Sequence, residues 1–291
     1  MRILLIGKNG QLGWEAHRSL ACLGEVYSLD YPEIDLTRPE SLREVVERVC
    51  PQVIFNAAAY TAVDRAESEI ETARLINAAA PEALARAAKK CGAVFVHVST
   101  DYVFDGTKQS AYLEDDLTHP LNAYGQTKLE GEQAVAAVGG CWLIFRTSWV
   151  YSMRRDSFVS KVLEWSRKNP QLRVVDDQVS NPTWARMLAE AIGLALARGG
   201  ADLYQGLEGR SGIYHLAGAG WCSRFEWAQE ILKNDPDPAT RLAQEIVPAK
   251  TADFPTPAQR PLSNRLDCGK FSRAFNLSLP PWRDALRLAM G

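Results

Sequence analysis

The sequence predicts an α/β protein with a doubly wound parallel sheet and a smaller C-terminal lobe. Over the first 150 of its 291 residues, short apolar runs alternate with longer segments of helical character. Strands separated by helices usually pair in parallel, and such sheets are covered by helices on both faces. Beyond residue 150 the alternation weakens, while proline, glycine and tryptophan become frequent. This change indicates a second lobe that is built differently from the first.

The expected strands of the first half follow the apolar runs. We place them at 2–6, 25–29, 53–56, 93–98 and 142–146, with helices near 11–22, 39–49, 71–90 and 124–138. Pro39 suits the first turn of a helix, where a missing N–H costs little, whereas Pro81 is expected to kink or divide the third helix.

The second half is expected to be helical with long loops. We place its helices near 156–168, 184–198, 224–233 and 281–290. The run 213–216 is typical of a strand that returns to the first sheet. Four tryptophans at helical positions are expected in the core, namely Trp165, Trp184, Trp227 and Trp282.

The turn after the first expected strand carries the strongest functional signal. Gly7, Gly10 and Gly13 follow an apolar strand and open a helix, and Asp30 follows the second strand. A dinucleotide pyrophosphate needs such glycines for a tight turn, a close backbone approach and close helix packing. The helix N-terminus offers N–H donors to the phosphates, and the carboxylate can accept bonds from ribose hydroxyls. The sequence therefore predicts a Rossmann-type NAD(P)-binding domain over 1–151 and a mainly substrate-binding lobe over 152–291.

Composition and charge exclude several classes of partner. The formal net charge is −2, which indicates neither a nucleic-acid nor a membrane surface. No apolar run reaches the length of a membrane span, and no signal-peptide pattern precedes the first strand. The six cysteines lie far apart without a CxxC pair, which is typical of reduced thiols. We therefore expect a cytoplasmic protein whose partner is a small molecule.

The fourth strand and the helix after it hold the candidate catalytic residues. Tyr124 and Lys128 are four residues apart, so they share one helix face, and Thr100 lies at the adjacent strand end. A phenol, whose ordinary pKa is about 10, is a poor proton donor at neutral pH unless a nearby ammonium lowers that pKa. With Thr100 holding the carbonyl oxygen, hydride from the cofactor and a proton from Tyr124 would reduce a ketone.

Three motifs in this order resemble the extended short-chain dehydrogenase/reductases. They are Gly7-x-x-Gly10-x-x-Gly13, the segment 99–104 (Ser-Thr-Asp-Tyr-Val-Phe) and Tyr124-x-x-x-Lys128. The segments 56–64, 146–151 and 255–261 narrow the resemblance to the reductases of dTDP-linked 4-keto-6-deoxy sugars, over nearly the whole chain. The resemblance implies that NADPH or NADH reduces the 4-keto group in the last step of dTDP-L-rhamnose synthesis.

The resemblance also implies roles for individual residues. Tyr124 would donate the proton, Lys128 would orient the ribose and lower the phenol pKa, and Thr100 would hold the sugar oxygen. Asp101 and Trp149 would touch the substrate. The implied cofactor contacts are Gly10, Gln11 and Leu12 at the pyrophosphate, Asp30 at the ribose, Asp35 and Leu36 near the adenine, and Ala59, Tyr60 and Thr61 beside the nicotinamide half.

Arg260 is a candidate for the substrate diphosphate, because a guanidinium can bond two phosphate oxygens. Elsewhere the chain departs from the family pattern. Ser180 stands where a glycine is often found. Some members are described with Mg²⁺ bridging acidic residues of two subunits, and here Glu15 is present but Arg186 stands at the place of an expected acid. We therefore predict no metal site, and the sequence leaves a monomer and a homodimer open.

Two alternatives to a reductase remain. Nucleotide-sugar epimerases and dehydratases share Tyr-x-x-x-Lys but retain tightly bound NAD, and dehydratases also need an acidic pair beside the strand-end threonine. Asp101 supplies one acid, but Tyr102 is not a second. A non-catalytic nucleotide-binding regulatory subunit would not need Thr100, Tyr124 and Lys128 together. Asp30 favours NADH by bonding the 2′-hydroxyl, although the resemblance suggests that both cofactors work.

Overall fold

The structure is a computed structural model that describes residues 1–291. Its centre is a six-stranded sheet in the order β10-β5-β4-β3-β1-β2, in which every neighbouring pair is parallel. The strands are β1 (Arg2–Ile6), β2 (Glu25–Leu29), β3 (Val53–Asn56), β4 (Val94–Thr100), β5 (Trp142–Thr147) and β10 (Gly212–His215). The predicted α/β fold with a parallel sheet is therefore confirmed. β4 ends two residues later than predicted, so Thr100 is its last residue.

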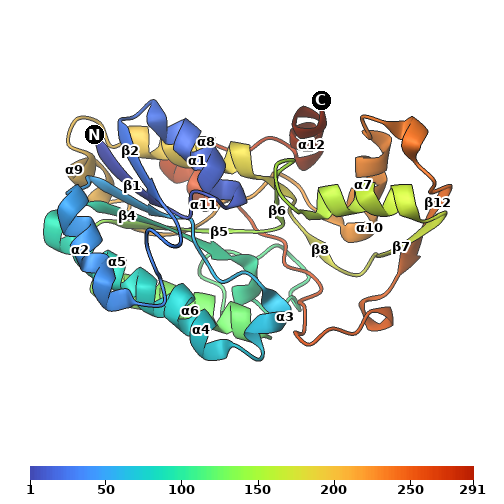
Figure 1. The fold of residues 1–291 in the computed structure, drawn as a ribbon, viewed down its shortest axis with the longest axis horizontal. Helices are drawn as coiled ribbons and strands as arrows, with labels where there is room; N and C mark the ends of the chain where they lie inside the picture. The colour runs from blue at the N-terminus through green and yellow to red at the C-terminus, as the bar shows by residue number, and fades with distance from the viewer.

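Helices cover both faces of this sheet because its strands are apolar on both sides (Figure 1). Leu4 and Ile6 of β1 face α2 (Pro39–Val49), α5 (Ala80–Cys91) and α6 (Ala123–Val138). Ile3 and Leu5 alternate with them and face α1 (Gln11–Ala21), α8 (Ala185–Ala197), α9 (Leu203–Glu208) and α11 (Gly269–Phe275). Three of these last four helices follow residue 151, so both halves of the chain build the core around the sheet.

The segment expected to return to the sheet is β10, which pairs with β5 at the sheet edge. The expected third helix is divided as Pro81 suggested. It consists of α4 (Ile70–Arg74), a π-helical turn (Leu75–Ala79) and α5, and Pro81 lies in the first turn of α5. Proline lacks an N–H and clashes with the preceding turn of an α-helix, so the wider π turn accommodates it.

A second lobe lies beyond the carboxyl ends of the strands (Figure 1). It packs α7 (Phe158–Lys168), α10 (Arg224–Lys233) and α12 (Trp282–Met290) with the parallel pair β7 (Gln171–Val175) and β12 (Glu245–Ala249). Short strands join it to the sheet domain, namely β6 (Val150–Tyr151) with β9 (Thr183–Trp184) and β8 (Val179–Ser180) with β11 (Cys222–Ser223). The remaining short helices are α3 (Val63–Ala66) and the 3₁₀ turns Asp101–Val103, Pro238–Thr240 and Thr251–Asp253.

Three of the four tryptophans expected in the core are buried, namely Trp184, Trp227 and Trp282. The expectation is wrong for Trp165, which is 39% exposed. Its face of α7 borders a cavity rather than another element. None of the helices is both long enough and apolar enough to cross a membrane.

Candidate active site

A cavity of about 980 Å³ lies at the carboxyl ends of the strands, where open α/β sheets bind ligands. It brings together most of the residues that the sequence singled out. Those that line it are Gly7, Gly10, Gln11, Leu12, Asp30, Ala59, Thr61, Thr100, Asp101, Tyr124, Lys128 and Trp149. Gly13, Asp35, Leu36, Tyr60 and Arg260 do not line it.

The glycine-rich turn has the shape of a phosphate cradle. Gly7 has a φ of +92°, which an L side chain rarely adopts, and a Cβ there would lie 2.7 Å from the amide nitrogen of Ala58. A Cβ on Gly13 would overlap the carbonyl oxygen of Gly7, so only glycine lets α1 pack this closely. Gly10 caps α1 without a side-chain hydrogen bond. The N–H groups of the first turn therefore keep their donors for an anion.

Asp30 lines the cavity but is already engaged with the backbone. Its carboxylate accepts hydrogen bonds from the N–H groups of Asn9 and Tyr31, each at 2.9 Å. Asp30 thus holds the glycine-rich turn in place. Asp35 instead accepts hydrogen bonds from Thr37, and Leu36 is buried among the residues between the sheet and α2.

The loop after β3, which carries Ala59, Tyr60 and Thr61, is held in place by Asn77. This asparagine is fully buried in the π-helical turn, accepts the N–H of Tyr60 at 2.9 Å and donates to the hydroxyl of Thr127 at 3.1 Å. The phenol of Tyr60 donates to Glu69 and so turns away from the cavity. Asn77 therefore ties the loop that carries Ala59 and Thr61 to α6.

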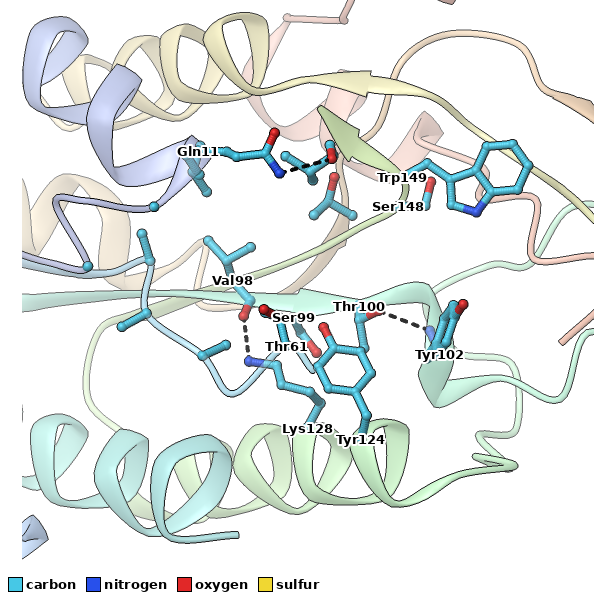
Figure 2. A pocket seen from close by; sticks show the side chains of 18 of the residues that line it. Gln11, Thr61, Val98, Ser99, Thr100, Tyr102, Tyr124, Lys128, Ser148 and Trp149 are labelled. Atoms are coloured by element: carbon cyan, nitrogen blue, oxygen red, sulfur yellow. Dashed lines mark hydrogen bonds between the residues drawn. The ribbon is translucent and has the colours of Figure 1, made fainter. Parts of the chain in front are cut away.

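Tyr124 and Lys128 rise from α6 toward the end of β4 (Figure 2). Asn122 caps α6 by accepting the N–H of Gly125 at 2.8 Å. A Cβ on Gly125 would overlap the carbonyl of Tyr102, so the first turn of α6 packs directly on the turn that follows β4. This packing sets Tyr124 beside Thr100, the last residue of the strand.

The electrostatics differ from the sequence expectation in one respect. Burial raises the pKa of Tyr124 above its ordinary value, and the hydroxyl of Thr100 opposes that rise only in part. The Nζ of Lys128 donates to the carbonyl of Val98 at 2.7 Å and lies 3.1 Å from Nε2 of His97 (Figure 2 shows the first contact). Burial lowers the pKa of Lys128 to about 8. Lys128 is therefore directed at β4, and it does not lower the pKa of the phenol in this structure.

Asp101 forms the floor of the cavity beside Thr100 and is 2% exposed. Its carboxyl group accepts hydrogen bonds from the hydroxyls of Thr100 at 3.1 Å and Ser180 at 3.2 Å. Burial raises the pKa of Asp101 to about 7, although both hydrogen bonds act in the opposite direction. Ser180, which replaces the glycine of the family pattern, thus contacts this acid directly.

Sequence reasoning missed Arg224, which lines the same cavity. Its guanidinium lies 3.7 Å from the ring centroid of Trp149, and that indole stacks on Trp227. Arg224 is the first residue of α10 and lies inside the capping box that Ser223 and Glu226 form. A cation in the first turn of a helix interacts unfavourably with the helix dipole. This unfavourable position is the feature of the sequence that could have marked Arg224 as a candidate site residue.

Arg260 lies in a neighbouring cavity of about 800 Å³, which shares Trp149, Val150 and Arg224 with the first. It forms an ion pair with Asp64 at 2.8 Å and contacts Thr256. The aromatic side chains of Phe158, Trp165 and Phe254 line this second cavity together with the cations Lys161 and Arg173.

The whole chain matches one protein family. The model of the RmlD substrate binding domain family aligns with residues 1–290. The chain belongs to this family. The dTDP-4-dehydrorhamnose reductase of Burkholderia thailandensis is 45% identical over 100% of this chain and 98% of its own. A reductase of the same name from Clostridium acetobutylicum has a solved structure with a TM-score of 0.90 and 33% identity, covering 100% of this chain and 98% of that one.

Another solved family member, the dTDP-4-dehydrorhamnose reductase of Bacillus anthracis in complex with NADP, has a TM-score of 0.88 and 31% identity. The alignment covers 99% of this chain and 98% of that one. The sequence predicts no bridging Mg²⁺ site, because Arg186 stands at the place of an expected acid. Here Glu15 forms an ion pair with Arg186 at 3.2 Å, and a cation in that place does not fit a metal ligand set. The structure contains no group of three or more His, Cys, Asp or Glu side chains that could hold a metal.

Proposed function

We propose that this protein reduces the 4-keto group of dTDP-4-dehydro-6-deoxy-L-mannose with NADPH or NADH and so produces dTDP-L-rhamnose. The observation that carries the proposal is the convergence of Thr100, Tyr124 and Lys128 with the glycine-rich turn in one cavity. The full-length relatives of that name, at up to 45% identity, support it.

The residues of the cavity fit a dinucleotide. Gly7, Gly10 and the first turn of α1 would hold the pyrophosphate. The glycine-rich turn has room only for backbone, and the first turn of α1 leaves its N–H groups free. Asp30 would lie at the adenosine ribose, and Ala59, Thr61 and Lys128 would surround the nicotinamide half. When bound, the reduced cofactor supplies a hydride. The arginines Arg154 and Arg155 line the same cavity and suit a 2′-phosphate, so we propose that both cofactors are accepted.

Tyr124 would donate the proton to the oxygen at C4 of the sugar. Its raised pKa keeps the phenol protonated until substrate arrives, and Thr100 would orient the same oxygen through its hydroxyl. Asp101 and Trp149, which line the same cavity, would contact the sugar ring. Lys128 would hold the ribose and favour the phenolate that remains after proton transfer.

The nucleotide diphosphate of the substrate would extend into the second cavity. Arg224 stands where the two cavities meet, and Arg260 lies farther along. Guanidinium groups bind phosphate oxygens in pairs, and aromatic faces such as Phe254 suit a flat base. We expect Arg260→Ala to raise the substrate KM with little change in kcat. An unchanged KM would show that the ion pair with Asp64 is only structural.

This assignment makes residues 1–151 the cofactor domain and 152–291 mainly the substrate lobe. We further propose that the enzyme acts in the cytoplasm, as a monomer or a homodimer, without nucleic acid or membrane partners. Sedimentation velocity at micromolar concentration would distinguish the two oligomeric states.

The test is cofactor oxidation with dTDP-, UDP- and GDP-linked 4-keto-6-deoxy sugars. We expect stoichiometric NADPH or NADH consumption with the dTDP sugar. An epimerase would convert substrate without net oxidation and copurify with NAD, and a regulatory subunit would show no turnover. Either result would overturn the proposal.

A further inference from the structure

His97 is a buried histidine that the proposed chemistry does not use. It lies on β4, is fully buried, and stands between Asn56 of β3 and Lys128 of α6. Its Nδ1 lies 3.2 Å from Nδ2 of Asn56, and its Nε2 lies 3.1 Å from Nζ of Lys128. The structure makes it the one imidazole in contact with the candidate catalytic lysine.

The orientation of the Asn56 amide determines which ring nitrogen carries the proton. The Oδ1 of Asn56 accepts the N–H of Ala58 at 3.2 Å, so the amide NH₂ must face His97. An amide NH₂ can only donate a hydrogen bond, and Nδ1 of His97 must therefore accept one. Burial lowers the pKa of His97 well below its ordinary value, so the ring is neutral. A neutral ring with an accepting Nδ1 carries its hydrogen on Nε2.

The hydrogen on Nε2 of His97 points at Nζ of Lys128, which is itself a hydrogen-bond donor when it is charged. An ammonium at Lys128 has three N–H donors and no lone pair, so it cannot accept from Nε2–H of His97. The neutral amine can accept this hydrogen and still donate to the carbonyl of Val98. The contact with His97 is therefore satisfied only when Lys128 has lost its proton.

One nearby carboxylate, Glu132, raises the pKa of Lys128, but the effect of burial is larger. Glu132 is the nearest acid on α6, and it is committed to a buried ion pair with Arg146 of β5 at 2.7 Å. The other titratable groups facing Lys128 are Tyr124 on the same helix and His97 on β4, and both are neutral. The pKa of Lys128, lowered to about 8, agrees with these surroundings.

We propose that His97, held by Asn56, is a positioning residue that presents Nε2–H to Lys128 and so favours its neutral amine over its ammonium form. Lys128 is then not a permanent cation. The Asn56–His97 pair then determines the pH at which Lys128 takes up its proton. The inference rests on the proposed function only where it concerns catalysis, because the hydrogen positions can be measured without substrate.

The first test needs no variant. Nitrogen NMR of ¹⁵N-histidine-labelled wild-type protein distinguishes the two neutral ring forms. The chain supplies a matched control in His215, which is also fully buried and whose Nδ1 lies 3.1 Å from the carbonyl of Tyr112. A carbonyl requires a donor, so His215 must carry its hydrogen on Nδ1. We expect opposite forms at the two sites, with Nε2–H at His97 across pH 6–9. Nδ1–H or a charged ring at His97 would overturn the proposal.

The second test reverses the hydrogen bond. In Asn56→Asp the carboxylate keeps the bond from Ala58 and accepts one from Nδ1–H of His97, so Nε2 becomes an acceptor for the Lys128 ammonium. The basic limb of the pH profile of kcat/KM should move to higher pH by at least about one unit, which corresponds to a tenfold change in the proton dissociation constant of Lys128. If kcat falls but the basic limb of the profile stays at the same pH, His97 has only a structural role. If Asn56→Asp does not fold, or the protein reduces another substrate, the wild-type NMR result still decides the inference.

Discussion

Replacing Asp101 by asparagine should stabilise the protein in a pH-dependent way. Asp101 is 2% exposed, and no cation forms an ion pair with its carboxyl group. Its pKa rises from the ordinary 3.8 to about 7 because burial penalises the charged form. An asparagine side chain has nearly the same shape and resembles the protonated acid, but it does not titrate.

The sign follows from the linkage between proton binding and folding. A pKa that is higher in the folded state contributes stability that is complete below pH 3.8 and is lost as the pH rises toward 7. The whole loss corresponds to about 4 kcal/mol, and the part between pH 5 and pH 8.5 to about 3 kcal/mol. The free energy of unfolding of Asp101→Asn, measured relative to wild type, should therefore rise by about 3 kcal/mol from pH 5 to pH 8.5.

Urea denaturation at pH 5 and pH 8.5 would measure this difference. Asp105, four residues away, provides a control of opposite sign, because the N–H of Thr107 is the largest effect lowering its pKa to about 2. The stability from Asp105 is complete above pH 3.8 and is lost only as the pH falls through about 2. The free energy of unfolding of Asp105→Asn should therefore be about 2 kcal/mol lower than that of wild type at both pH values. An Asp101→Asn effect of the same size at pH 5 and pH 8.5 would refute the reasoning.

Three further substitutions test other parts of the site. Tyr124→Phe should lower kcat at least about 10²-fold while NADPH affinity, measured by fluorescence titration, stays within about twofold; near-normal turnover would remove Tyr124 from its role. Gly13→Ala should weaken NADPH binding at least about tenfold, because the added methyl overlaps the Gly7 carbonyl, and thermal shift with and without cofactor measures the loss. Glu132→Gln should destabilise the protein by about 3–5 kcal/mol, because it leaves Arg146 buried without its partner; a loss below about 1 kcal/mol in urea would contradict this.

The sheet and its cofactor turn could be predicted because local patterns determine them. β1 alternates Ile3 and Leu5 with Leu4 and Ile6 between two cores, which makes the strand an unbroken apolar run that any reader of the sequence finds. The glycines of the turn are needed for backbone reasons that depend only on near neighbours. Tyr124 and Lys128 share a helix face by spacing alone.

The rest depends on contacts between segments far apart in the chain. Nothing near Arg224 indicates that it will lie over Trp149, 75 positions earlier, because the two meet only when α10 packs against β6. Arg260 could not be placed for the same reason, since its partner Asp64 comes from the other lobe. The direction of Lys128 toward β4 depends on His97 and Val98, which periodicity marks only as a buried strand.

The edge position of β10 has a consequence for biosynthesis. While the ribosome still holds the segment beyond 151, β5 has an unpaired backbone edge, and its apolar surface lacks α8 and α11. Exposed strand edges of this kind promote association between chains. We therefore expect a fragment ending near residue 151 to aggregate when expressed alone, and a nascent chain to become protease-resistant only after α11 has emerged.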